Sequence, residues 1–173
     1  MEKILFTGAP GAGKGTQSKL LIPYGFQHIS TGDLIRNTKD TEILSYLEKI
    51  GKGGFLPDKL IFKLIEKSIG NKNYILDGAV RTLAQAEYVK EKELVDKVFF
   101  LYAERKTCIN RLLNRNQGRT DDNIEIIKKR FNKYYRDTFP TLRYLKDNFD
   151  FYSINGEKPI EEINYEIMDI LDL

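Results

Sequence analysis

The chain has 173 residues, of which 41% are hydrophobic and 31% are charged, and its formal net charge is +3. This composition is typical of one globular domain spanning residues 1–173, and so small a net charge does not favour nucleic acid as a partner. A single cysteine, Cys108, and a single histidine, His28, exclude an internal disulfide and a zinc site built from these ligands.

No run of apolar residues approaches the roughly 20 that a membrane-spanning helix needs. The first apolar stretch is short and ends in a glycine-rich loop, so we read no signal peptide. We therefore expect a cytoplasmic protein without a membrane partner, and we expect it to be a monomer.

Buried strands are predicted at five apolar stretches, residues 3–7, 26–30, 73–77, 97–102 and 149–154. Apolar residues recur at helical spacing between them. Strands that alternate with helices predict an α/β fold with a doubly wound, five-stranded parallel sheet.

Two segments between the predicted elements stand out. Residues 31–72 are too long for one crossover helix and predict three helices, of which residues 31–60 would form a small lobe. Residues 115–121 are polar and unpatterned between two helices, and they predict a mobile loop near the carboxyl ends of the strands, where ligands of such sheets bind.

The first predicted strand runs into a glycine-rich loop at residues 8–16, and a helical segment follows. Glycines let backbone N–H groups turn toward an anion, and the side chain of Lys14 can reach the outer phosphates of a nucleoside triphosphate. The usual pattern places a hydroxyl directly after the lysine, whereas here Gly15 intervenes before Thr16. Thr16 either touches Mg²⁺ or a phosphate oxygen, or it bonds back to its own helix.

The third predicted strand ends in Asp77, at the sheet edge that also holds the glycine-rich loop. A carboxylate there would hold Mg²⁺, through water because Mg²⁺ keeps much of its hydration shell. The alternative is an aspartate that only caps a helix or a turn.

Arg111, Arg115 and Arg119 lie within nine residues, and their mutual repulsion favours an anion between them. The alternative is a solvated charged face. His28 lies in an apolar stretch and is expected to be a structural core residue, and Cys108 is expected to be a buried thiol. No nucleophile–histidine pair is evident, and none is needed where the acceptor is itself a phosphate.

Taken together, these segments resemble the adenylate kinases in their short-lid form, over nearly the whole chain. The resemblance rests on residues 8–16, 28–36, 54–58, 77–86, 111–122, 130 and 155–159. It implies a P-loop nucleotide kinase fold, in which residues 31–60 form the lobe that binds the nucleoside monophosphate and residues 115–121 form the lid.

The resemblance also implies site residues. The ATP site would comprise Gly11, Ala12, Gly13, Lys14, Gly15, Thr16, Arg111, Arg115 and Lys158. The AMP site would comprise Thr31, Gly32, Arg36, Leu56, Gly78, Arg81, Gln85, Arg119 and Arg130. The catalytic residues would be Lys14, Arg81, Arg115, Arg119 and Arg130, and Asp77 and Thr16 would hold Mg²⁺ through water.

The implied reaction is reversible phosphoryl transfer from Mg-ATP to AMP, giving two ADP, with Mg²⁺ as cofactor and no zinc. Two alternatives remain: a kinase acting on UMP or CMP, and a nucleotide-binding protein with weakened turnover. The family usually has an aromatic residue and a proline after Asp-Gly, where this chain has Ala79 and Val80. This departure predicts a weakened AMP site, with either a reshaped loop or retained strain before Val80.

Overall fold

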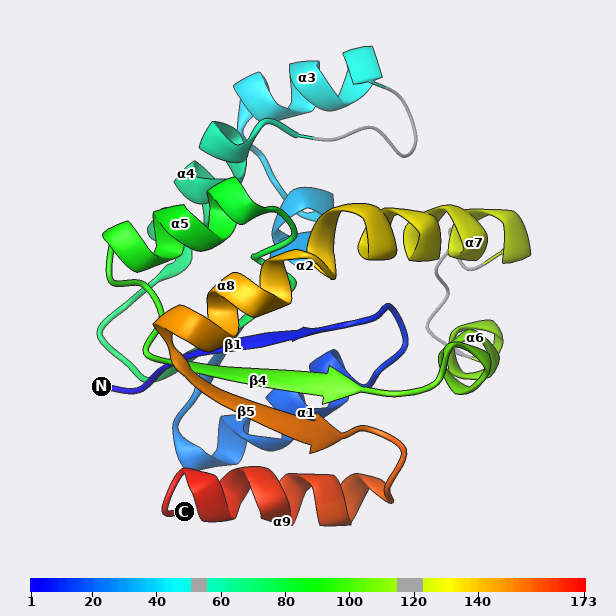
Figure 1. Ribbon diagram of the computed structural model, residues 1–173. Helices are drawn as coiled ribbons and strands as arrows, with labels where there is room; N and C mark the ends of the chain where they lie inside the picture. Colours follow the sequence, from blue (N-terminus) through cyan, green and yellow to red (C-terminus); the bar gives the residue numbers. More distant parts are fainter. Residues whose placement is uncertain (51–55, 115–122) are drawn as a thin grey trace.

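The computed structural model describes residues 1–50, 56–114 and 123–173 (Figure 1). Its strands form one parallel sheet in the order β2-β3-β1-β4-β5. The strands are β1 (Lys3–Gly8), β2 (Gln27–Ser30), β3 (Tyr74–Asp77), β4 (Lys97–Tyr102) and β5 (Asp150–Asn155). The predicted fold class is confirmed, and each strand begins and ends within one residue of its predicted range.

The sheet separates two hydrophobic cores because alternate residues of a strand face opposite sides. Leu5 of β1 lies opposite Leu76 and Val98, and these three residues belong to one core. Ile4 and Phe6 belong to the other core. All five side chains are fully buried, so the central strand is covered on both faces.

Helices cover both faces of the sheet, as Figure 1 shows. On one face lie α3 (Thr41–Ile50), α4 (Asp58–Ser68), α5 (Leu83–Glu91) and α8 (Thr141–Asn148). The other face packs against α1 (Lys14–Leu20) and α9 (Ile160–Ile170), while α6 (Arg105–Leu113) and α7 (Ile124–Lys133) contribute side chains to the same hydrophobic cluster. The remaining elements are η1 (Ile22–Tyr24), α2 (Thr31–Arg36) and the π-helical turn η2 (Tyr134–Thr138).

In the described part of the segment between β2 and β3 there are three helices, α2, α3 and α4, as predicted. Side chains cap two of the helices that begin near the carboxyl edge of the sheet. The backbone N–H of Asp33 donates to Ser30 Oγ at the start of α2, and that of Gln85 donates to Thr82 Oγ1 at the start of α5, both over 3.3 Å. These caps fix where the helices begin, and hence where their first residues lie.

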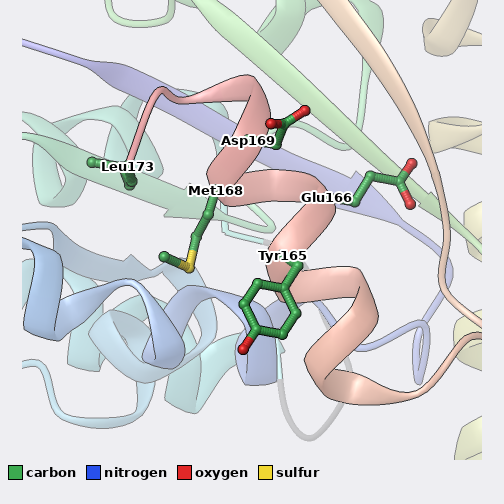
Figure 2. Close-up of a pocket in the computed structure, with 5 residues that line it drawn as sticks. All are labelled: Tyr165, Glu166, Met168, Asp169 and Leu173. Carbon is green, nitrogen blue, oxygen red and sulfur yellow. The ribbon is translucent and has the colours of Figure 1, made fainter.

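A hollow of about 470 Å³ lies on α9 and is lined by Tyr165, Glu166, Met168, Asp169 and Leu173 (Figure 2). Helix α9 begins after β5, at the carboxyl edge, and runs back beside the sheet. The hollow is in its later half, away from the loops that follow the strands. Among the described residues, no helix is long and apolar enough to cross a membrane.

Candidate functional site

The loop after β1 has a backbone that only glycine adopts easily. Gly8, Gly11 and Gly13 have φ values of +142°, +86° and +103°. A Cβ at Gly8 would lie 2.2 Å from the carbonyl oxygen of Leu101, and one at Gly11 would lie 2.5 Å from that of Cys108. Gly8 and Gly11 are therefore required twice, by backbone angle and by close packing against β4 and α6, whereas Gly13 is required by its backbone angle.

The side chain of Lys14 forms hydrogen bonds with the backbone of the glycine-rich loop. Its Nζ donates hydrogen bonds to the carbonyl oxygens of Gly8 and Ala9, each over 2.9 Å. Burial lowers the pKa of Lys14, Arg81 and Arg130 lower it further, and Asp77 opposes them. The ammonium is thus held beside the glycines, where an added anion would stabilise its charge.

Asp77, at the end of β3, accepts a hydrogen bond from His28 on the neighbouring strand. The distance from His28 Nε2 to Asp77 Oδ2 is 3.3 Å. Burial alone would raise the pKa of Asp77, but the His28 hydrogen bond and the charges of Lys14 and Arg81 outweigh it and lower the pKa. Asp77 is therefore a carboxylate at neutral pH.

His28 was expected to be a structural core residue, and it is largely buried, but its hydrogen bond to Asp77 was not foreseen. Its side chain is 11% exposed and its imidazole pairs with the site carboxylate. His28 and Ser30 share a face of β2, and Ser30 lies opposite Asp77. Sequence reasoning missed this contact because it depends on β2 pairing with β3, which no local pattern states. Cys108 is fully buried, and burial raises the pKa of its thiol, so the prediction for this residue is confirmed.

The oxygen atoms near Asp77 fit the requirements of Mg²⁺. A Cβ on Gly15 would lie 3.3 Å from Asp77 Oδ2, so the start of α1 lies against this carboxylate. Thr16 follows Gly15 and is exposed. Mg²⁺ commonly binds one or two protein oxygens together with substrate phosphates and water. Asp77 and Thr16 can supply such oxygens, and their assignment stays a prediction.

Arginines from separate segments surround the same edge of the sheet. Desolvation and the nearby charge of Arg130 lower the pKa of Arg81, and Arg36 adds to this, while Asp77 opposes it. Arg81 Nε also donates to the carbonyl oxygen of Gly78 over 3.1 Å. The three arginines come from α2, the loop after β3 and α7. Guanidinium groups that repel one another at close range make a site for phosphate.

Lys133 is a member of this cluster that sequence reasoning missed. Burial and the charge of Arg81 lower the pKa of Lys133 to about 8. It follows Arg130 by three residues on α7, so the two side chains lie on one side of the helix. The three-residue spacing was the available signal in the sequence, but it indicates a shared site only once Arg130 is known to lie near Arg81.

The predicted AMP side contains several of its expected residues in one region. Thr31 is 2% exposed, and its hydroxyl has no hydrogen-bond partner among the described residues. Arg36 pairs with Asp33 over 2.5 Å, and its guanidinium lies 3.2 Å from where a Cβ on Gly32 would be. Leu56 is buried in the hydrophobic core, at 5% exposure.

The peptide bond before Val80 is trans, so the loop after Asp77 is reshaped relative to the usual family sequence, which was the first of the two alternatives. The described residues contain no cis peptide bond, and Gly78 turns the chain with a φ of +70°. Ala79 and Val80 are 1% and 2% exposed and belong to the hydrophobic core. The side chain at position 79 is thus core rather than open surface. A weakened AMP site stays a prediction.

Gln85 is held at both ends of its amide. Its Nε2 donates to Asp58 Oδ1, and its Oε1 accepts from the backbone N–H of Arg81, each over 2.6 Å. The side chain is almost fully buried. Asp58 ends the segment 54–58 that the resemblance included, but it was given no role of its own, and its contact with Gln85, 27 residues away on another helix, was not foreseen.

On the predicted ATP side, Arg111 donates from Nη1 to the carbonyl oxygen of Gly156 over 2.7 Å. A Cβ on Gly156 would lie 2.8 Å from the carbonyl oxygen of Ala12, so the loop after β5 packs on the glycine-rich loop. The side chain of Lys158 points elsewhere: its Nζ pairs with Glu166 of α9 over 2.7 Å. The structure thus gathers Arg111 with the glycine-rich loop, but not the ammonium of Lys158.

Some predicted residues lie outside the described residues. These are Arg115 and Arg119, the lid at residues 115–121, and the part of segment 54–58 that precedes Leu56. Their roles stay predictions.

Comparisons with known proteins agree with this geometry. A sequence model of the adenylate kinase family matches residues 6–149. An adenylate kinase of Porphyromonas gingivalis is 39% identical over 191 residues, covering 99% of this chain and 96% of that protein. An adenylate kinase of Encephalitozoon cuniculi is 37% identical over 161 residues, covering 89% of each. UMP-CMP kinase 3 of Arabidopsis thaliana is 37% identical over 180 residues, covering 96% of this chain and 87% of that protein.

The family model spans the glycine-rich loop, Asp77 and the arginine cluster, and relatives named adenylate kinase match the chain over nearly its whole length. The chain belongs to the adenylate kinase family.

Proposed function

We propose that this enzyme transfers the γ-phosphoryl group of Mg-ATP directly to AMP, giving two ADP, and that one chain is sufficient for the reaction. The observation that carries the proposal is the convergence of Lys14, Asp77 and Arg81 at one edge of the sheet. Each comes from a different segment, and each perturbs the pKa of another. Charges arranged in this way can bind two phosphate-bearing ligands whose phosphates meet end to end.

The donor lies along the glycine-rich loop. Backbone N–H groups of Gly11, Gly13 and Gly15 turn toward its phosphates, and the Lys14 ammonium exchanges two carbonyl partners for phosphate oxygens. Arg111 and the loop at Gly156 flank the adenine. Mg²⁺, held through water by Asp77 and Thr16, would neutralise charge on the phosphates.

The acceptor is a phosphate monoester, which is largely dianionic near neutral pH and needs no protein base to deprotonate it. Arg36 and Arg81 would bind this phosphate, and Arg130 would neutralise charge on the group in flight. Arg115 and Arg119 would complete the set from residues 115–121, as the family resemblance implies. The protein thus contributes alignment, neutralisation and exclusion of water.

A second candidate acceptor is a pyrimidine monophosphate, because one relative is a UMP-CMP kinase. Gln85 favours adenine, since its amide both donates and accepts along one base edge. A third candidate is nucleotide binding without turnover, supported only by Ala79 and Val80 in place of the usual residues.

The test is an assay that couples ADP formation to a recorded signal, with ATP as donor and AMP, UMP or CMP as acceptor. We expect AMP to give the highest kcat/KM. The Lys14→Met variant should lose at least about 100-fold in kcat/KM for ATP, as expected for the loss of a charged phosphate contact.

The control is Lys19→Met, which removes an exposed lysine from the same helix and should keep full activity. A higher kcat/KM for UMP or CMP would replace the proposal by a pyrimidine kinase. If no acceptor gives turnover faster than the ATP hydrolysis seen without an acceptor, the remaining interpretation is a protein that binds nucleotides without turnover.

A further inference from the structure

The amide of Gln85 is attached at both ends to groups that differ in hydrogen-bonding chemistry. At one end stands the Asp58 carboxylate, which accepts hydrogen bonds, and at the other stands the backbone N–H of Arg81, which donates. If the amide turned over, its oxygen would face a carboxylate and its NH₂ group would face an N–H. Both hydrogen bonds would become repulsive contacts, so the amide has one favoured orientation.

The two helices that carry these side chains are joined along their length. Figure 1 shows α4 and α5 next to each other. One turn beyond Asp58 and Gln85, the rings of Phe62 and Tyr88 stack with centroids 3.6 Å apart. The Tyr88 hydroxyl then donates to Glu66 of α4. Asp58 is thus held at a set distance from Gln85 and does not swing freely on a loop.

One donor and one acceptor of the amide remain for a ligand. Asp58 uses one of the two N–H groups of Gln85, and Arg81 uses one of the two lone pairs of its oxygen. Adenine presents an N–H donor at its 6-amino group beside the acceptor N1. Hypoxanthine, of the same size, presents the 6-oxo acceptor beside an N1–H donor, so its pattern is reversed.

We propose that Asp58 is a positioning residue that fixes which end of the Gln85 amide meets the base, and that it thereby makes the monophosphate site select 6-aminopurines over 6-oxopurines. The inference rests on the proposed function, in which Gln85 meets the base of AMP. In the fixed orientation, adenine forms two hydrogen bonds, whereas hypoxanthine opposes acceptor to acceptor and donor to donor.

The test compares AMP with IMP, its 6-oxopurine counterpart, as acceptors in the ADP-forming assay, supported by calorimetric titration of each nucleotide. For the unaltered enzyme we expect kcat/KM for AMP to exceed that for IMP by at least about 100-fold, because two buried groups would be left opposed. In Asp58→Asn, either end of the Gln85 amide can pair with the new amide, so that only the Arg81 N–H still fixes the orientation, and the AMP-to-IMP ratio should fall about 3-fold or more. The KM for ATP should stay unchanged.

The matched control is Glu66→Gln, which removes a carboxylate from the other end of the α4–α5 contact and leaves the Gln85 amide untouched. It should keep the AMP-to-IMP ratio of the unaltered enzyme. If Asp58→Asn does not fold, Asp58→Ser, which also removes the carboxylate, serves in its place.

Equal kcat/KM or equal affinity for AMP and IMP in the unaltered enzyme would overturn the inference, as would an Asp58→Asn enzyme with an unchanged ratio. ADP formation from AMP in the same assays would leave the proposed function standing in either case. An enzyme that binds AMP but does not phosphorylate it would refute the proposed function, and the calorimetric AMP-to-IMP ratios of the unaltered enzyme and of Asp58→Asn would then decide the inference.

Discussion

Gly11 and Gly25 have nearly the same backbone angle, with φ values of +86° and +87°, but very different surroundings. A Cβ on Gly11 would collide with the backbone carbonyl of Cys108, whereas a Cβ on Gly25 would meet nothing within 4 Å. The two positions separate the conformational role of a glycine from its packing role. At Gly11 both roles serve the phosphate loop.

We predict that Gly25→Ala lowers the free energy of unfolding by about 1–2 kcal/mol, the cost of a left-handed angle for a residue with a Cβ. Gly11→Ala should lower it further, because the carbonyl of α6 must move, and should reduce kcat/KM for ATP at least about 10-fold. Urea denaturation and steady-state kinetics measure the two effects. Equal losses in the two variants, with ATP kinetics unaffected by either, would mean that the loop does not depend on this close contact.

At the scale of elements, α7 and the π-helical turn η2 place two cations and a hydroxyl near Arg81. Arg130 and Lys133 are on α7, and the turn that follows brings the Thr138 hydroxyl to the carbonyl oxygen of Arg81, over 3.1 Å. A π-helical turn inserts one extra residue per turn and so re-aims the side chains that follow. This turn thereby couples α7 to the loop after β3.

Lys133 gives this element a pH dependence. Its folded-state pKa is lowered from 10.5 to about 8 by burial and by Arg81, with Arg136 adding to this and Asp137 opposing it. Between about pH 8 and pH 10.5, the Lys133 side chain binds more protons in the unfolded chain than in the folded chain. The contribution of Lys133 to the free energy of unfolding therefore rises with pH. Below pH 8 both states are protonated, and the folded enzyme carries the full penalty.

We therefore predict that Lys133→Met melts a few °C above the unaltered enzyme at pH 7, and that the difference shrinks toward zero as the pH approaches 10. Lys128→Met, which removes an exposed lysine of the same helix, serves as the control and should melt with the unaltered enzyme throughout. Thermal unfolding followed by circular dichroism provides the measurement. A difference that is constant across pH 7–10 would show that the Lys133 charge does not oppose folding.

At the scale of the whole molecule, the parallel sheet collects the loops after all five strands at one edge. The predicted donor side lies where the loops after β1 and β5 meet at Ala12 and Gly156. The predicted acceptor side forms where α2, the loop after β3 and α5 approach. Arg81 and Lys14 stand between them.

This arrangement predicts two nucleotides per chain. Calorimetric titration of AMP into enzyme saturated with a non-transferable ATP analogue should give one site, and the reverse order should give one more. Both affinities should weaken with added salt, because phosphate binding by clustered cations is screened. Saturation by a single nucleotide, with no room for a monophosphate beside it, would contradict two adjoining sites.

Much of the fold and part of the site could be predicted from the sequence because the signals are local. Apolar runs that alternate with segments of helical periodicity identify a parallel α/β sheet. The glycines before Lys14 indicate positions where the backbone adopts a positive φ. Asp77 was expected at the crevice because it ends a strand. Each of these inferences uses residues within one element or its adjoining loop.

The remaining features depend on contacts between distant segments. His28 meets Asp77 only because β2 pairs with β3. Asp58 meets the Gln85 amide only because α4 and α5 lie together. No local pattern in the sequence predicts either of these pairings.

The sequence by itself determined the strands, the crossover helices and the phosphate loop, since hydrophobic periodicity and glycine backbone angles are properties of neighbouring residues. Only the tertiary structure decided which charges share the crevice, which partner holds each of them, and how the Gln85 amide is oriented. Those outcomes arise from the order of strands in the sheet and the packing of helices on it, which bring together side chains far apart along the chain.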